Sequence, residues 1–136
     1  MDSTVWGPKL WFVMHTFAYS YPDNPSKDEQ YAMEQFFNNL KYTIPCNICR
    51  NHYKDILEKT PVSKYLSCRD ELFKFTVDVH NVVNKSLGKP IYSYDDALKD
   101  HLSKYKPTEP KTHNTYMLMF FIALFIFICI YLKVRS

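Results

Sequence analysis

The sequence predicts an all-α protein: a bundle of four helices with a short fifth helix, followed by a linker and a C-terminal transmembrane helix. Apolar residues recur at helical spacing through the first hundred residues, and proline or serine separates the segments. The chain of 136 residues has only 2 glycines, which disfavours the tight turns of an all-β fold. An uncharged apolar stretch close to the C-terminus stands apart from this pattern.

Each helix is expected from the residues that start and stop helices. The first is expected over 6–19, the second over 26–42, the third from the paired cysteines to about residue 58, the fourth over 67–87, and the short fifth from about residue 93. Thr4 lies near the cap position of the first helix. Ser26 and Glu29 have the spacing of a capping box at the start of the second. Ser67 is the expected cap of the fourth helix, and Gly88 is placed as the residue that follows its C-terminus.

Four regions follow from composition: a domain over 1–104, a polar linker over 105–115, a transmembrane helix over 116–132 and a short basic tail over 133–136. The apolar segment is near the short end of the length that spans a bilayer, and tyrosines lie at its two ends. The first residues lack the basic start and apolar run of a signal peptide, so we expect a single-pass tail anchor with the domain on the cytosolic side.

Several function classes are disfavoured by motif and charge. Neither a GxGxxG nor a GxxxxGK segment is present, which excludes the usual dinucleotide and P-loop sites. The formal net charge of +3 is too small to demand a nucleic-acid partner. Aromatic residues make up 17% of the chain, enough for a compact core or a site that binds a flat ring.

Cysteine chemistry is the most specific signal. Cys46 and Cys49 form a CxxC pair directly after a proline, whereas Cys68 and Cys129 have no close partner. A helix that begins here would place both sulfurs within one turn and would stabilise a thiolate. From spacing alone, the pair is either a disulfide that opens and closes or half of a metal site.

One face of the first helix carries Trp11, His15 and Tyr19 at successive i, i+4 positions. An aromatic core stripe with one hydrogen-bonded histidine explains this spacing. A ligand-binding face explains it as well, and the spacing does not decide between the two.

The fourth helix carries an unusual polar run. His80 shares a face with Asn84, and Asn81 shares one with Lys85. A solvated polar face is the ordinary interpretation. The alternative is a site in which asparagine and histidine bond a heterocycle while Lys85 and Lys89 face phosphates.

Four segments together resemble a known family: WGPKLWFVMH at 6–15, Tyr21-Pro22, PCNIC at 45–49, and HNVVNKSLGKP at 80–90. In this order and spacing they look like the Erv/ALR family of FAD-linked sulfhydryl oxidases. The resemblance covers roughly residues 5–101 and is greatest to the short members of large DNA viruses. Such an oxidase would serve a virus that forms its own disulfide-bonded proteins.

The resemblance implies a four-helix bundle with a short fifth helix that binds FAD, usually as a homodimer. It also implies which residues contact the flavin, with Cys49 beside the ring: Gly7, Trp11, His15 and Tyr19 from the first helix, and His80, Asn81, Asn84, Lys85 and Lys89 from the fourth helix and its end. An aromatic residue after the KP segment also covers the cofactor in the family. Tyr92 and Tyr94 are both candidates here.

The implied activity is the oxidation of protein dithiols. A substrate would attack Cys46, Cys49 would pass electrons to the flavin, and O2 would accept them to give H2O2. Many family members carry a second, mobile cysteine pair, which this chain lacks. We therefore expect either direct substrates or a thioredoxin-like shuttle protein as partner.

Other interpretations stay open. Cys68 is a spare thiol or the site of an intermolecular disulfide, and His52 is a surface histidine or a group that tunes Cys49. A zinc-binding module would use Cys46, Cys49, Cys68 and His80, whereas a tail-anchored helical adaptor would need no turnover. The family interpretation itself implies no metal site.

Overall fold

The computed structural model of the chain describes residues 2–105 together with positions 121, 124, 133 and 135. The predicted linker and the predicted transmembrane segment 116–132 lie almost wholly outside the described residues. Among the residues that are described, no helix is long and apolar enough to cross a membrane. The domain boundaries given above therefore remain predictions.

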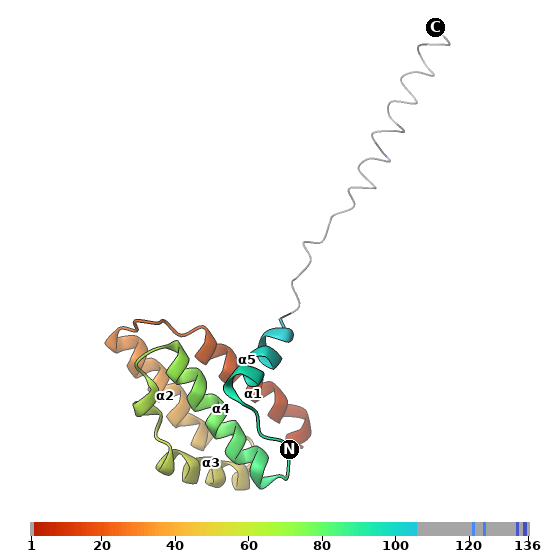
Figure 1. Cartoon of the computed structure of the whole chain (residues 1–136). Coiled ribbons are helices and arrows are strands. Elements are labelled where there is room, and N and C mark those ends of the chain that lie inside the picture. Colours follow the sequence, from red (N-terminus) through yellow and green to blue (C-terminus); the bar gives the residue numbers. More distant parts are fainter. Residues whose placement is uncertain (1, 106–120, 122–123, 125–132, 134, 136) are drawn as a thin grey trace. The chain divides into compact units, whose positions relative to one another are not determined.

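Five α-helices and one short 3₁₀ helix form residues 2–105, and this part of the chain contains no strand (Figure 1). The prediction of an all-α fold with a short fifth helix is confirmed for these residues. In chain order the helices are α1 (Ser3–Tyr19), α2 (Lys27–Thr43), α3 (Asn47–Lys59), η1 (Val62–Tyr65), α4 (Arg69–Ser86) and α5 (Tyr94–Ser103).

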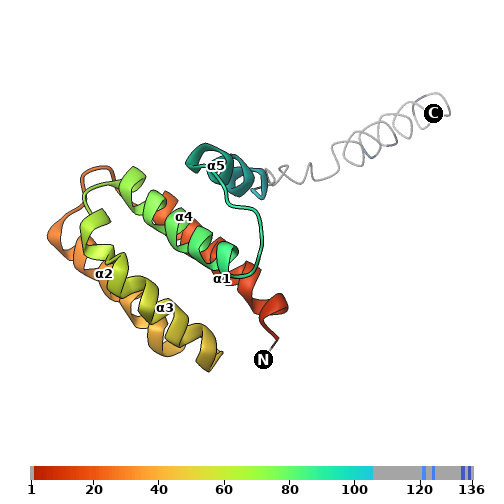
Figure 2. The ribbon, with the colours of Figure 1, turned by 60° about the horizontal axis from the view of Figure 1, so that its bottom comes forward.

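The longer helices pack as two pairs, α1 along α4 and α2 along α3, as Figure 1 and Figure 2 show from two directions. Aromatic residues join the pairs: the fully buried rings of Phe37 in α2 and Phe75 in α4 meet edge to face at 5.2 Å. The Tyr53 hydroxyl of α3 donates to the Phe37 carbonyl at 3.1 Å. The short α5 packs on α1 and α4.

The predicted capping box of α2 is confirmed. The Ser26 hydroxyl accepts the Glu29 N–H at 3.2 Å, and the Glu29 carboxylate accepts the Ser26 N–H at 2.7 Å. Both bonds satisfy backbone donors that a helix N-terminus leaves free. The start of α2 is therefore determined by side chains that are local in the sequence.

Two predicted caps are wrong. The first helix begins at Ser3, because the Asp2 carboxylate accepts the Thr4 N–H at 2.8 Å and places Thr4 inside the first turn. For α4 the N-cap is Cys68 rather than Ser67, and no side chain bonds the free N–H groups there. The start of α4 therefore does not depend on a serine cap.

The C-terminus of α4 ends in the turn that the sequence predicts. Gly88 has a φ of 66° and follows Leu87, the C-cap residue of α4. Its N–H donates to the Lys85 carbonyl at 3.2 Å, and the Lys89 N–H donates to the Asn84 carbonyl at 2.9 Å. This pair of bonds is a Schellman motif, which closes the helix and turns the chain toward α5.

Candidate active site

The two paired cysteines form a disulfide at the N-terminus of α3, with a Cα–Cα distance of 5.2 Å. Cys46 is the N-cap residue, and its Sγ accepts the Cys49 N–H at 3.2 Å. Within the described part of the chain, no three His, Cys, Asp or Glu side chains converge to hold a metal ion. Cys68 is a free thiol. The structure therefore fits the disulfide interpretation of the CxxC pair. The four side chains considered for a zinc site, Cys46, Cys49, Cys68 and His80, do not come together in the described residues.

A cavity of about 520 Å³ opens beside the disulfide, between α1, α3, α4 and the α5 region. Cys49 lines this cavity, whereas Cys46 does not. The two sulfurs thus differ in what they face. The predicted site residues that also line the cavity are Gly7, Trp11, His15, His80, Asn84 and Lys89.

Three predicted flavin contacts do not line this cavity: Tyr19, Asn81 and Lys85. Asn81 and Lys85 border a shallower hollow of about 370 Å³ instead. The Tyr19 ring lies beside Phe73 and His101. The roles of these three residues toward a cofactor remain predictions.

Asn81 has a structural task in this arrangement. Its amide donates to the Tyr92 carbonyl at 2.8 Å and accepts the Tyr92 N–H at 2.9 Å. These two bonds hold the segment that connects α4 to α5, and Tyr92 lines the cavity. Tyr94 instead donates to Asp78 at 2.8 Å, a bond that raises the pKa of Tyr94 to about 12. Of the two candidate tyrosines, Tyr92 is thus the one at the cavity.

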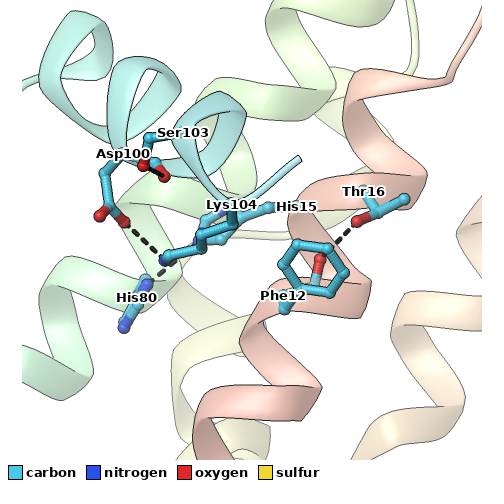
Figure 3. A network of polar contacts seen from close by, with 7 residues as sticks. All are labelled: Phe12, His15, Thr16, His80, Asp100, Ser103 and Lys104. Carbon is cyan, nitrogen blue, oxygen red and sulfur yellow. Dashed lines mark hydrogen bonds and ion pairs between the residues drawn. The ribbon is translucent and has the colours of Figure 1, made fainter. Parts of the chain in front are cut away.

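A stack of rings forms one wall. The rings of Trp11 and His80 are nearly parallel, with centroids 4.1 Å apart, and His15 lies beside both. His15 Nε2 and His80 Nδ1 are 3.1 Å apart (Figure 3). On the other side of the ring, His15 Nδ1 lies 2.8 Å from the Thr76 hydroxyl. The proposed ligand-facing stripe of α1 thus meets the polar run of α4.

The hydrogen-bond chain assigns the tautomers. The Thr76 hydroxyl donates to the Phe73 carbonyl at 2.7 Å, so it accepts from His15 Nδ1. A neutral His15 then accepts at Nε2, and His80 Nδ1 is the donor. The remaining nitrogen of a neutral His80, Nε2, is therefore an acceptor in the cavity wall.

Both histidines are neutral at pH 7. Burial is the main cause that lowers the pKa of His15 to about 3, and the neighbouring His80, His101 and Lys104 add to it. Burial, followed by Lys104 and Lys89, lowers the pKa of His80 to about 4. The ring wall therefore presents hydrogen-bonding groups without positive charge.

Two charged residues lie at the α5 edge of the cavity, and sequence reasoning assigned no role to either of them. Lys104 and Asp100 both line the cavity and form an i, i+4 ion pair of 2.6 Å (Figure 3). The Tyr105 hydroxyl donates to Thr16 Oγ1 at 2.8 Å and ties the end of α5 to α1. The i, i+4 spacing of the ion pair was the available sequence signal.

Two further side chains carry polar atoms that are buried without a partner among the described residues. They are Trp6, at Nε1, and His101, at both ring nitrogens. Trp6 lines the cavity, whereas His101 is 1% exposed and packs among Phe12, Phe73 and Tyr105. Buried polar atoms are nearly always satisfied, so Trp6 Nε1 is a donor available to a bound group.

The structure combines four longer helices with a redox-type CxxC disulfide at the mouth of a ring-lined cavity. These features define a helical thiol–disulfide protein with space for a flat cofactor. The match of residues 8–107 to the Erv1 / Alr family model specifies the class. The chain belongs to the Erv1/Alr family.

Viral and cellular relatives agree with this assignment. A probable FAD-linked sulfhydryl oxidase of Acanthamoeba polyphaga mimivirus is 35% identical over 119 residues, which is 87% of this chain and 83% of the relative. A FAD-linked sulfhydryl oxidase of African swine fever virus is 35% identical over 67% of this chain and 75% of its own length. The FAD-binding domain of Erv1 from Saccharomyces cerevisiae is a similar solved structure, with a TM-score of 0.71, 28% identity, and coverage of 78% of this chain and 99% of that one.

Proposed function

We propose that the chain is a FAD-dependent thiol oxidase that converts protein dithiols to disulfides through Cys46 and Cys49. One observation carries the proposal: Cys49 lines the ring-walled cavity, while its disulfide partner Cys46 does not. A substrate can therefore exchange at one sulfur while the other sulfur adjoins the space for a cofactor. Family membership supports the same activity.

The cavity fits the proposed cofactor in size and chemistry. Its volume of about 520 Å³ lies within the range of roughly 300–1,000 Å³ that small-molecule sites occupy. The Trp11 and His80 rings would hold a flat ring system, and the partnerless Trp6 Nε1 would donate to it. Lys89 and Lys104 are the cations in the cavity lining that would hold the phosphates.

The protein's own chemistry is thiol–disulfide exchange. A substrate thiolate attacks Cys46 Sγ, the Cys46–Cys49 bond breaks, and Cys49 leaves as a thiolate. The second substrate thiolate attacks the substrate sulfur of this mixed disulfide, so the substrate leaves oxidised and both cysteines are reduced. FAD, when bound, supplies the two-electron chemistry that returns the pair to a disulfide and reduces O2 to H2O2.

The wider setting is part of the proposal. A homodimer is supported by the exposed apolar side chains of Val13 and Phe17 on α1, which are 38% and 42% exposed. Segment 116–132 would anchor the chain as a single-pass tail, with the oxidase domain on the cytosolic side of a host or virion membrane. A thioredoxin-like shuttle protein would deliver dithiols. The viral relatives support a viral setting.

The test is a comparison of purified full-length variants. The wild type should show a flavin absorption band and should consume oxygen when a dithiol is added. Cys46→Ser and Cys49→Ser should retain the flavin and lose oxygen consumption, whereas Cys68→Ser, which removes the free thiol, should keep it. A wild-type chain that neither carries nor accepts FAD would refute the proposal, and protease protection in intact cells would test the orientation of the domain.

A further inference from the structure

The two sulfurs of the disulfide have unequal electrostatic support. Cys46 Sγ sits at the N-cap of α3 and accepts the Cys49 N–H at 3.2 Å, so a thiolate there is stabilised by the helix start. Cys49 is the third residue of the helix, and within residues 2–105 nothing donates a hydrogen bond to its Sγ. Yet in the proposed exchange Cys49 is the leaving thiolate, and a leaving sulfur departs faster when its thiol has a low pKa.

His52 occupies the position that would supply this support. It follows Cys49 by three residues within α3, a spacing that puts the two Cβ atoms about 5–6 Å apart on one helix face. Both side chains line the same cavity. The His52 ring has no hydrogen bond or ion pair with another residue in the described part of the chain, so no other interaction engages its two nitrogens.

We infer that His52, as an imidazolium, stabilises the Cys49 thiolate that forms when a substrate thiolate attacks Cys46. The inference rests on the proposed thiol oxidase function and deepens it. In this step a bond forms between the substrate sulfur and Cys46, the Cys46–Cys49 bond breaks, and the electron pair goes to Cys49 Sγ. The proton stays on His52 throughout, so the step needs no other reactant.

The other charged and titratable groups around the cavity do not replace His52. His15 and His80 are neutral at pH 7 because burial lowers the pKa of each. Lys104 is paired with Asp100 at the α5 edge. The remaining groups are Lys89, Tyr53 and Tyr92 in the cavity lining, Arg50, Lys54 and Asp55 on α3, and Lys41 on α2.

Two of these cations have other tasks. The Arg50 guanidinium donates to the Ile44 carbonyl and to Asn47, which directs it back over the helix start. Lys41 lies over the Tyr42 ring at 5.2 Å from its centroid. His52 is therefore the cation candidate one turn from Cys49 on the cavity face.

The experiment measures the reactivity of Cys49 directly, without relying on turnover. In the full chain carrying Cys46→Ser, iodoacetamide labelling of Cys49 is followed from pH 5 to 9 by mass spectrometry of its peptide. His52→Gln in this background should raise the labelling midpoint by about one pH unit, which is roughly tenfold slower labelling at neutral pH. Cys68 in the same sample is the internal reference, and its labelling should not change.

Two matched variants separate charge and position from general structural damage. His52→Lys keeps a cation and should keep Cys49 labelling fast. The double variant Asn51→His with His52→Asn preserves composition but moves the imidazole to the neighbouring, exposed position of α3, so labelling should slow as in His52→Gln.

An unchanged Cys49 midpoint in both His52→Gln and the double variant would overturn the inference. Failure of the proposed function would appear differently, as a chain without bound FAD or without dithiol-dependent oxygen uptake. The labelling result does not depend on either of those measurements.

Discussion

Replacement of Gly88 is the most direct test of how the end of α4 is built. Gly88 has a φ of 66°, in the left-handed region that L side chains rarely adopt. A Cβ added there would meet nothing within 4 Å. The cost of Gly88→Ala is therefore a backbone cost, free of any clash.

The magnitude follows from two opposing terms. The left-handed conformation costs a non-glycine residue about 1–2 kcal/mol, while alanine gains about 0.4–1 kcal/mol because it restricts the unfolded chain. We expect Gly88→Ala to lower the free energy of unfolding by about 1 kcal/mol, or the melting temperature by about 4–8 °C. Gly88→Asn should cost less, because asparagine tolerates this conformation better.

Urea unfolding of the full chain at a fixed, saturating FAD concentration measures the difference, with far-ultraviolet circular dichroism as the signal. An equal slope of free energy against urea for all variants would show that the same transition is being compared. If Gly88→Ala proves as stable as the wild type, the Schellman turn formed by the Gly88 and Lys89 N–H groups is not what ends α4.

Three further predictions concern the site and its scaffold. Acidification from pH 7 to 5 should lower the free energy of unfolding, because the pKa of His15 is lowered to about 3 and that of His80 to about 4 in the folded chain, so the unfolded chain binds more protons below about pH 6.5. His15 alone accounts for about 2 kcal/mol of this loss of stability. Urea unfolding at the two pH values measures the loss, and it should be smaller in His15→Gln. Ser26→Ala removes the capping box and should cost about 1 kcal/mol in the same assay. Asn81→Ala removes both hydrogen bonds to the Tyr92 backbone and should weaken FAD binding about fivefold, measured by fluorescence titration. An unaltered affinity would show that these two bonds do not shape the site.

The fold was predictable where a local signal and the packing agree. The Ser26 capping box and the glycine after α4 are short-range devices, and both appear as expected. The start of α4 was not predictable in this way, because Ser67 and Cys68 are adjacent and the structure uses the cysteine without any capping bond. At α1 an aspartate outcompeted the threonine, since a carboxylate accepts a helix N–H more strongly than a hydroxyl does.

In the site, spacing along one helix determines some features, and the pairing of helices determines the others. Helical spacing brought Trp11 and His15 to one face, but their meeting with His80 depends on the pairing of α1 with α4, which no local pattern specifies. The same pairing creates the hydrogen-bond chain that fixes both tautomers, so the chemical character of the ring wall is a tertiary property. Asn81 shows how a residue type alone can mislead. An amide on the fourth helix could bond a heterocycle, but both the donor and the acceptor of the Asn81 amide bond the Tyr92 backbone. The polar residue type thus pointed to the right region of the chain. Asn81 contributes to the cavity indirectly, because it holds the segment that places Tyr92 in the cavity wall.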